Sequence, residues 1–249
     1  MNRYLLEISY DGLGYSGWQI QSNDKTIQGE LQESMSTLLG LDIKLVGAGR
    51  TDSGVHAIKS FAHFDINKEI NCNELKFKLN GFLSKKIAIH NIFLVNSDFH
   101  ARFSAISRTY EYHINFKKDP FLNNKSFFHL KPLDLNLFNE GCSYIIGKKD
   151  FSAFCKSKSD VKNKVCNVTY ANCSSNNDMF IFEITANRFL HNMVRSIVGT
   201  LIDFSLSKIN KNEILDIISS KDRTKSGYSV PPYGLYLVNV EYPKDIFCE

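Results

Sequence analysis

The sequence predicts an α+β protein built from two similar half-domains, residues 1–105 and 106–249. Three observations predict this class. The chain has 249 residues, enough for roughly one to two domains. Its composition, 43% hydrophobic and 22% charged, is ordinary for a globular protein. Alternating strand patterns flank a helical pattern in each half, and the short connections favour antiparallel neighbours.

Hydrophobic periodicity places the elements of the first half. Residues 3–10 alternate between apolar and other side chains, which predicts a strand. Residues 27–39 have apolar side chains at helical spacing, and Gly40 follows as a typical helix-ending residue. The remaining predicted elements are strands at 43–48, 60–66 and 87–95 and a helix at 73–82.

The second half repeats the pattern of strands around a helix. Residues 109–116 alternate and predict a strand, while 165–171 and 179–186 predict a strand pair around a polar turn. Residues 188–203 are amphipathic with the period of a helix, and 235–242 predict a closing strand. The repeat lies in the pattern, because residue identity between the halves is low.

Cysteine spacing, hydropathy and charge exclude several classes of protein. The six cysteines form no Cys-x-x-Cys pair and have no histidine at zinc-ligand spacing, so we expect reduced thiols and no structural zinc. No run approaches the roughly 18 apolar residues of a membrane span, and Glu7 interrupts any signal-like segment. We therefore expect a cytoplasmic protein with no membrane partner. The net charge of +4 permits an anionic partner without requiring one.

Basic residues concentrate in predicted loops, where lysines are usually solvated surface. They are Lys85, Lys86, Lys117, Lys118, Lys148 and Lys149, and a run of Lys156, Lys158, Lys162 and Lys164. Phe151 and Phe154 precede that run, and aromatic rings beside lysines suit base stacking and phosphate neutralisation. This pattern alone leaves both interpretations open.

The densest candidate for chemistry is the glycine-rich segment 47–57. Within it, Arg50 and Asp52 are two residues apart, so in an extended backbone their side chains share a face and can pair. A neighbouring arginine keeps a carboxylate ionised, and an ionised carboxylate is a usable nucleophile. The alternative is that Asp52 is an ordinary turn residue, and the spacing alone does not decide between the two.

Five ordered segments carry a resemblance to a known family. Residues 49–57 read Gly-Arg-Thr-Asp-Ser-Gly-Val-His-Ala, which resembles the signature of the tRNA pseudouridine synthase A family. The other segments that resemble motifs of this family, in the family's order, are residues 10–19, 99–105 with 108–112, 189–195 and 231–237. Ser53 departs from the pattern, where alanine is frequent, but both residues are small and no catalytic role is affected.

The resemblance implies two α+β half-domains with abutting antiparallel sheets and a basic active-site cleft between them. It also implies isomerisation of uridine to pseudouridine without a cofactor or metal. By matching position, Asp52 would be the nucleophile, attacking either the ribose C1′ or the base C6. Arg50 would displace the paired base or bind phosphate, and Arg195 would pair with the Asp52 carboxylate. Tyr110 would stack on the flipped uracil and is a candidate to take the C5 proton.

Local patterns alone interpret two of these residues differently. Periodicity makes Tyr110 a core aromatic. On a helical wheel of 188–203, Arg195 lies on the polar face with His191 and Gly199, which predicts a solvated arginine.

Further residues have expected roles in binding substrate. His100 and Arg102 match a family segment that contacts RNA. Leu235 and Leu237 would form an apolar floor beneath the uracil, although they read as ordinary strand core. His56 either satisfies a buried backbone group or touches substrate, and the sequence does not decide.

The resemblance also implies a homodimer that embraces one tRNA and acts at nucleotides 38, 39 and 40 of the anticodon stem-loop. One site that serves several neighbouring positions suggests recognition by shape and backbone contacts. Two alternatives stay open: a related synthase acting on another RNA position, and a non-catalytic RNA-binding protein. A glycosidase-like hydrolase would use a carboxylate pair, and the motif supplies only Asp52.

Overall fold

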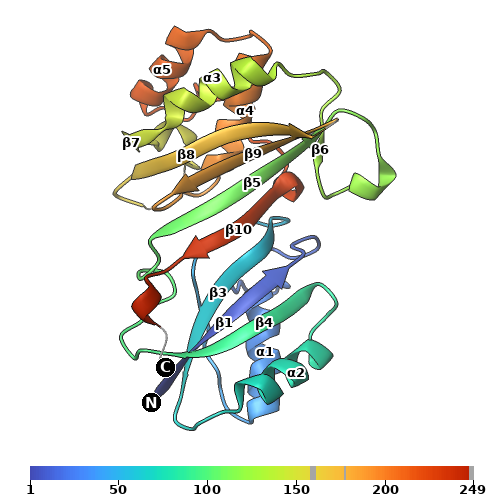
Figure 1. The fold of residues 1–249 in the computed structure, drawn as a ribbon, viewed down its shortest axis with the longest axis vertical. Coiled ribbons are helices and arrows are strands. Elements are labelled where there is room, and N and C mark those ends of the chain that lie inside the picture. Colours follow the sequence, from blue (N-terminus) through green and yellow to red (C-terminus); the bar gives the residue numbers. More distant parts are fainter. Residues whose placement is uncertain (158–160, 177, 247–249) are drawn as a thin grey trace. The chain divides into compact units, whose positions relative to one another are not determined.

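The structure, a computed structural model, describes residues 1–157, 161–176 and 178–246. It divides into two compact units. Unit 1 comprises Met1–Ile106 and Leu237–Glu249, and unit 2 comprises Ser107–Tyr236. In Figure 1 each unit is a β-sheet with helices packed on it, so the predicted α+β class is confirmed.

The sheet of unit 1 is antiparallel, with the strand order β4-β1-β3. The elements of unit 1 up to residue 95 are β1 (Asn2–Tyr10), α1 (Ile27–Leu39), β2 (Val46–Gly47), β3 (His56–Ile66), α2 (Cys72–Phe82) and β4 (Ile87–Val95). In the centre of the sheet Leu6 on β1 lies opposite Ala62 on β3 and Ile92 on β4. Helix α1 begins where the Thr26 side chain accepts a hydrogen bond from the Gly29 amide. The buried faces of these elements form the core of unit 1.

The segment after residue 236 returns to unit 1. Strand β10 (Leu235–Glu241) crosses the boundary between the units, and a short 3₁₀ helix, Lys244–Ile246, follows it. The Ile106 amide donates to the Glu241 carbonyl at 2.8 Å, and the Tyr242 hydroxyl donates to the Ala101 carbonyl at 2.6 Å. The linear division at residue 105 did not anticipate that this segment belongs with the first unit.

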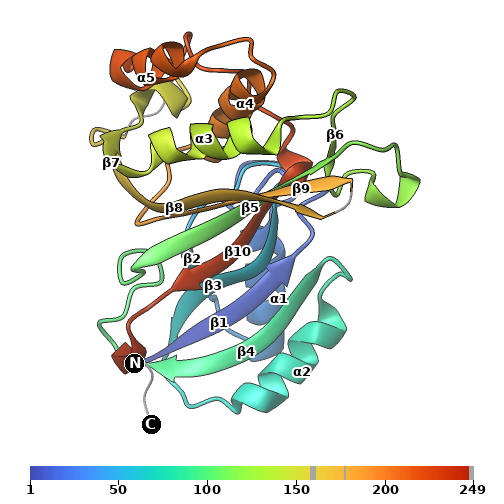
Figure 2. The same cartoon turned by 45° about the horizontal axis from the view of Figure 1, so that its top comes forward.

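The sheet of unit 2 has the order β5-β9-β8-β7, with antiparallel neighbours. Its elements are β5 (Ser107–Asn115), β6 (Phe127–Phe128), α3 (Leu135–Ile145), β7 (Gly147–Asp150), β8 (Val165–Asn176), β9 (Met179–Ala186), α4 (Met193–Ser205) and α5 (Lys211–Ser220), with short 3₁₀ helices at Pro120–Leu122, Ser152–Phe154 and Pro232–Gly234. β6 pairs with β5 in parallel, an exception to the predicted antiparallel pattern. Helix α3 packs against β8 and α4, as the turned view in Figure 2 shows.

Two predicted elements are shorter than expected, for identifiable reasons. The predicted strand 43–48 is reduced to Val46–Gly47, because side chains of α1 take the backbone hydrogen bonds of Leu45. Gln32 accepts from the Leu45 amide and Gln28 donates to its carbonyl. The predicted helix 188–203 begins only at Met193, because Asn192 has a left-handed backbone conformation that a helix cannot include.

The expected polar face of that helix is also wrong. Gly199 is buried, and a Cβ placed on it would lie 1.9 Å from the Tyr228 carbonyl oxygen. Lys148 and Lys149, which were expected in a loop, lie on β7. Lys158 lies outside the described residues.

Candidate functional site

The Asp52 segment forms a tight turn between β2 and β3. The Val55 amide donates to the Asp52 carbonyl at 3.2 Å, and Gly54 has a φ of 78°. Asp52 is half-buried and Arg50 is exposed. Thr51 is buried between them, and its hydroxyl shares a 2.8 Å hydrogen bond with the hydroxyl of Tyr10 on β1. The turn is therefore fixed to the sheet at the residue before Asp52.

A loop of residues 11–18, the support loop below, packs against this turn. The Trp18 amide donates to the Thr51 carbonyl at 3.1 Å, and the Ser53 hydroxyl donates to the Tyr15 carbonyl at 3.0 Å. A Cβ placed on Gly17 would lie 2.6 Å from the Thr51 carbonyl oxygen, so only glycine allows this approach. Two segments that resemble family motifs, 10–19 and 49–57, thus form one packed structure in unit 1.

His56 lies at the start of β3 and is buried. Its Nδ1 accepts a hydrogen bond from the Gly12 amide at 3.2 Å and lies 3.0 Å from a carboxylate oxygen of Asp11. Of the two interpretations left open by the sequence, the structure shows the contact with a buried backbone group.

His100 and Arg102 lie in a turn after β4. The His100 ring accepts hydrogen bonds at Nδ1 from the amides of Arg102 and Phe103, at 3.1 and 3.3 Å. Burial lowers the pKa of His100, which favours the neutral ring that these bonds require. The guanidinium carbon of Arg102 lies 5.6 Å from the centre of the Phe103 ring, and Phe103 is 75% exposed. An exposed ring beside a cation is an arrangement that can stack on a nucleotide base.

Tyr110 lies on β5 in unit 2 and is half-buried. Its ring makes an edge contact with Phe189, with the centroids 5.0 Å apart. Tyr112, two residues further along the strand, is fully buried, and its hydroxyl donates to the Pro231 carbonyl at 2.8 Å. Burial raises the pKa of Tyr112 strongly. The strand thus changes from core at Tyr112 to partial exposure at Tyr110.

Arg195 lies in the first turn of α4 and is half-buried. Its Nε donates to the Val230 carbonyl at 2.7 Å, and the Val230 amide donates back to the Arg195 carbonyl at 3.3 Å. The Asn192 side chain donates to the hydroxyl of Ser229 at 2.6 Å. These bonds tie the guanidinium to the loop before the 3₁₀ helix Pro232–Gly234, so Arg195 is held in place rather than freely solvated.

A second arginine, Arg223, donates several hydrogen bonds to the same loop, which precedes the 3₁₀ helix Pro232–Gly234. Arg223 donates to the hydroxyls of Ser226 and Ser229 at 2.7 and 2.8 Å and to the Gly227 carbonyl at 3.2 Å. No sequence motif pointed to this residue. Its signal is geometric, because one planar guanidinium satisfies several acceptors of a single loop.

The predicted site residues are distributed over both units. Arg50, Asp52, His100 and Arg102 belong to unit 1, and Tyr110 and Arg195 belong to unit 2, as does Leu235, while Leu237 belongs to unit 1. Both leucines are buried. Within unit 1 the structure joins the Asp52 turn to the support loop, and within unit 2 it joins Arg195 to Val230.

Metal-ligating side chains do not cluster in the part of the chain that the structure describes. There, no group of three or more His, Cys, Asp or Glu side chains is placed to hold a metal ion. Cys72, Cys142, Cys155, Cys166 and Cys173 have free thiols, and Cys248 lies outside the described residues. Across the same described ranges, every helix is too short or too polar to cross a membrane.

Comparison with known proteins agrees with the resemblance that the motifs gave. The model of the family described as tRNA pseudouridine synthase matches residues 8–104 and 142–243. These ranges include Asp52 and Arg195, whereas Tyr110 lies between them. The chain belongs to the tRNA pseudouridine synthase family.

Full-length relatives support the same assignment. A protein of Azobacteroides pseudotrichonymphae named tRNA pseudouridine synthase A is 42% identical over 247 residues, covering 99% of each chain. Relatives of the same name from Parabacteroides distasonis and Caldicellulosiruptor bescii are also 42% identical, over 99% and 97% of this chain and 98% and 100% of their own. A chain of the crystal structure of a Cbf5-Nop10-Gar1 complex aligns over 94% of this chain and 57% of its own, with a TM-score of 0.37 and 10% identity, which is a weak likeness.

Proposed function

We propose that this protein isomerises uridine to pseudouridine at positions 38, 39 and 40 of the tRNA anticodon stem-loop, with Asp52 as the nucleophile. The observation that carries the proposal is the full-length similarity to tRNA pseudouridine synthases, which includes the Asp52 segment. The reaction class is an intramolecular transfer, so the protein is an isomerase.

The chemistry needs one ionised carboxylate beside the junction of sugar and base. The bond between ribose C1′ and base N1 breaks, the uracil turns, and C5 bonds to C1′. C5 then loses a proton and N1 gains one, so atoms and electrons balance without an oxidant or reductant. The Asp52 carboxylate attacks either C1′ or C6 and leaves again in the last steps. A turn fixed by Thr51 and Ser53 supports such a role, because it limits the movement of the nucleophile.

Three further side chains complete the proposed site. Arg50, exposed at the edge of the turn, enters the space of the displaced base or binds phosphate. Arg195 pairs with Asp52, and its bond to Val230 supports a positioning role by limiting the orientations of the guanidinium. Tyr110 stacks on the uracil and is a candidate to take the C5 proton. The residues proposed for the site therefore come from both units.

The proposed partner is tRNA, bound through phosphate contacts and stacking. His100 and Arg102 present the exposed Phe103 ring beside a cation, which supports a role in binding RNA. We further propose a cytoplasmic homodimer in which one tRNA contacts both subunits. Sedimentation of the free protein, and of the protein with tRNA, measures this stoichiometry; a monomer in both states refutes the dimer.

Tritium release from tRNA labelled at uracil C5 tests the function, because C5 loses its hydrogen when it becomes the glycosidic carbon. Wild type and Asp52→Ala are compared, with Asp216→Ala, an exposed carboxylate on α5, as the matched control. We expect release by wild type and by the control, and none by Asp52→Ala.

The substrate is varied in the same assay. Loss of release when uridines 38 to 40 are replaced supports the proposed positions. Release that survives the replacement moves the target to another RNA position. Tight tRNA binding by wild type without release from any tRNA favours the non-catalytic RNA-binding alternative.

A further inference from the structure

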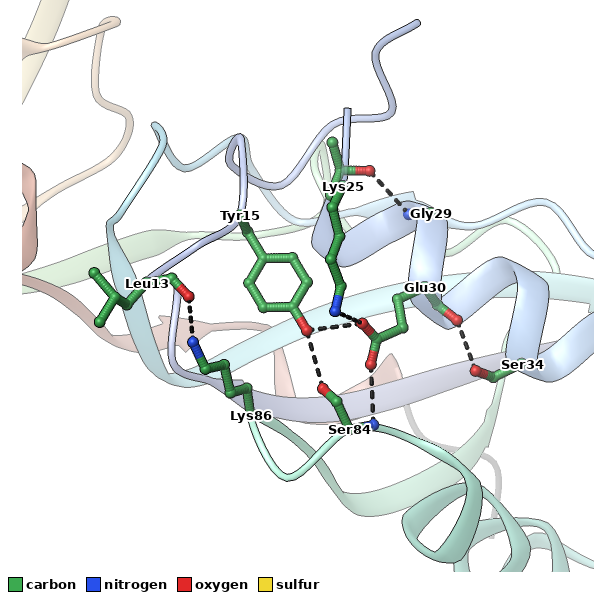
Figure 3. Close-up of polar contacts among 9 residues, drawn as sticks. Leu13, Tyr15, Lys25, Gly29, Glu30, Ser34, Ser84 and Lys86 are labelled. Carbon is green, nitrogen blue, oxygen red and sulfur yellow. Dashed lines mark hydrogen bonds and ion pairs between the residues drawn. The ribbon is translucent and has the colours of Figure 1, made fainter. Parts of the chain in front are cut away.

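A polar network at the base of the support loop lies outside the residues assigned to catalysis (Figure 3). The Tyr15 hydroxyl donates to the Glu30 carboxylate on α1 at 2.7 Å and lies 2.9 Å from the Ser84 hydroxyl. The Ser84 amide donates to the other Glu30 oxygen at 3.0 Å, and the Lys25 ammonium lies 3.2 Å from the carboxylate. Tyr15 is 2% exposed, so its hydroxyl makes these contacts away from bulk water.

The carboxylate at the centre of this network is held ionised. Burial acts to raise the pKa of Glu30, but hydrogen bonds from Ser84, Tyr15 and Lys25 outweigh it and lower the pKa to about 2. Charge-assisted hydrogen bonds of this kind are stronger than neutral ones and fix the groups that make them. Glu30 is therefore a charged hydrogen-bond acceptor for Tyr15 at neutral pH.

Other contacts clamp the support loop to the same turn between α2 and β4. The Lys86 ammonium donates to the Leu13 carbonyl at 2.6 Å, and the Asp11 amide donates to the Lys86 carbonyl at 2.8 Å. Figure 3 shows Lys86 below Leu13, and beside them the Tyr15 ring extending from the loop toward Glu30 and Ser84. The support loop is thus held to α1 and to the turn before β4 at several points.

The loop transmits this constraint to the catalytic turn. The side chain of Tyr15 is hydrogen-bonded to Glu30. Its backbone carbonyl accepts a hydrogen bond from the Ser53 hydroxyl at 3.0 Å. Trp18, at the end of the loop, donates its amide to the Thr51 carbonyl. Residues on both sides of Asp52 therefore bind the backbone of the loop that Tyr15 and Glu30 fix.

We propose that Tyr15 and Glu30 are positioning residues for the reaction, because their hydrogen bond holds the support loop that fixes the Asp52 turn. This inference rests on the proposed role of Asp52 as nucleophile. It goes further by assigning a function to a pair of side chains that act only through Ser53 and Thr51. A pair that merely stabilises the fold would change the free energy of unfolding and leave the chemistry of folded molecules intact.

Tyr15→Phe tests the inference, because it removes the hydroxyl and keeps the ring and the carbonyl. Tyr4→Phe is the matched control: Tyr4 is 3% exposed in the same unit, and its hydroxyl accepts from the Ile70 amide, remote from the Asp52 turn. We expect Tyr15→Phe to lower kcat about tenfold or more, since small misplacement of a reacting group is costly. KM for tRNA should change less than about twofold, because ground-state binding is kept. Tyr4→Phe should retain the wild-type kcat.

A double-mutant cycle separates positioning from stability. Glu30→Ala removes the carboxylate that the Tyr15 hydroxyl contacts, so the double variant should have about the kcat of the more damaged single variant. Multiplicative effects on kcat would show that the two side chains act independently and would overturn the inference. If Tyr15→Phe does not fold, Ser84→Ala, which removes the other hydroxyl beside Tyr15, takes its place in the cycle.

The failure of this inference is distinguishable from the failure of the proposed function. Wild-type kcat in Tyr15→Phe, with Asp52→Ala inactive, overturns the positioning role alone. Full turnover by Asp52→Ala, or no tritium release by wild type, overturns the proposed function whatever Tyr15→Phe does.

Discussion

The packing of Gly17 against the backbone of the Asp52 turn gives the sharpest prediction. Gly17 has a φ of 93°, and a Cβ there would lie 2.6 Å from the Thr51 carbonyl oxygen and 3.1 Å from the Asp52 carbonyl carbon. Gly17→Ala therefore combines a strained backbone with a backbone clash. Gly40→Ala separates the two terms, because Gly40 has a φ of 66° and no atom within 4 Å of its Cβ position.

The expected magnitudes follow from these two terms. An L-residue in the left-handed region costs about 1–2 kcal/mol, which is the whole effect at Gly40. Overpacking adds about 1–3 kcal/mol at Gly17, for a total of about 2–5 kcal/mol. Restoring an ordinary 3.4 Å contact moves the Thr51 backbone by about 0.8 Å (3.4 minus 2.6). A displacement near 1 Å beside a nucleophile can lower turnover by about 100-fold.

Urea unfolding and tritium release measure the two effects on the same preparations. We expect both variants to be less stable than wild type, and only Gly17→Ala to lose kcat when rates are expressed per folded molecule. Wild-type kcat in Gly17→Ala, or equal stability losses in the two variants, would refute the claim that the loop and the turn are packed against each other.

Three further predictions concern stability. Glu30→Gln should lower the free energy of unfolding by about 1–3 kcal/mol at pH 7. Because folding lowers the pKa of this carboxyl, the difference from wild type should vanish as the pH falls from 4.5 toward about 2. Urea unfolding at a series of pH values measures this difference. His63, whose ring accepts from the Ala101 amide, has a pKa lowered by burial to about 4, so the unfolded chain takes the proton first. The free energy of unfolding of the wild type should therefore decrease as the pH falls from 6.5 to about 4. His63→Gln should lack this decrease, which thermal unfolding at a series of pH values measures. Arg223→Lys keeps the charge but loses the planar guanidinium that donates to Ser229 and its neighbours. The free energy of unfolding, measured in urea, should fall by about 1–3 kcal/mol.

Each of these predictions has a control or a contrary outcome. Glu74→Gln removes an exposed carboxylate paired with Lys78 and should leave the free energy of unfolding close to that of wild type; a loss as large as that of Glu30→Gln would contradict the network. Parallel pH dependence in wild type and His63→Gln would show that another group titrates. An unchanged urea midpoint for Arg223→Lys would mean that a lysine ammonium stabilises the loop as well as the guanidinium does.

Local periodicity predicted elements in which buried and more exposed side chains recur at a regular spacing. The structure places a helix at Ile27–Leu39 and strands at Ile87–Val95 and Met179–Ala186, with the predicted bounds. The pattern failed at residues 43–48, because glutamine side chains of α1 capture the backbone there. Helices α3 and α5 were not predicted, although α5 begins with a capping box of Asn210 and Glu213 that is readable in the sequence.

Motif resemblance located the family and the Asp52 turn, but it did not reveal what supports that turn. Tyr15 is separated from Glu30 by 15 residues and from Ser84 by 69, so no local spacing encodes their contacts. The same holds for the bond between Arg195 and Val230, 35 residues apart. Such pairs are specified by the three-dimensional fold, which brings together residues that are distant in the sequence.

The return of the chain to unit 1 has a consequence for synthesis on the ribosome. Unit 2 is one continuous stretch, Ser107–Tyr236, so all of its residues are synthesised before residue 237. Unit 1 is interrupted in the sequence. Glu241 and Tyr242, which form hydrogen bonds with Ile106 and Ala101, are synthesised only after the whole of unit 2. A chain that ends before residue 237 would therefore contain every residue of the second unit but lack the segment that completes the unit carrying Asp52.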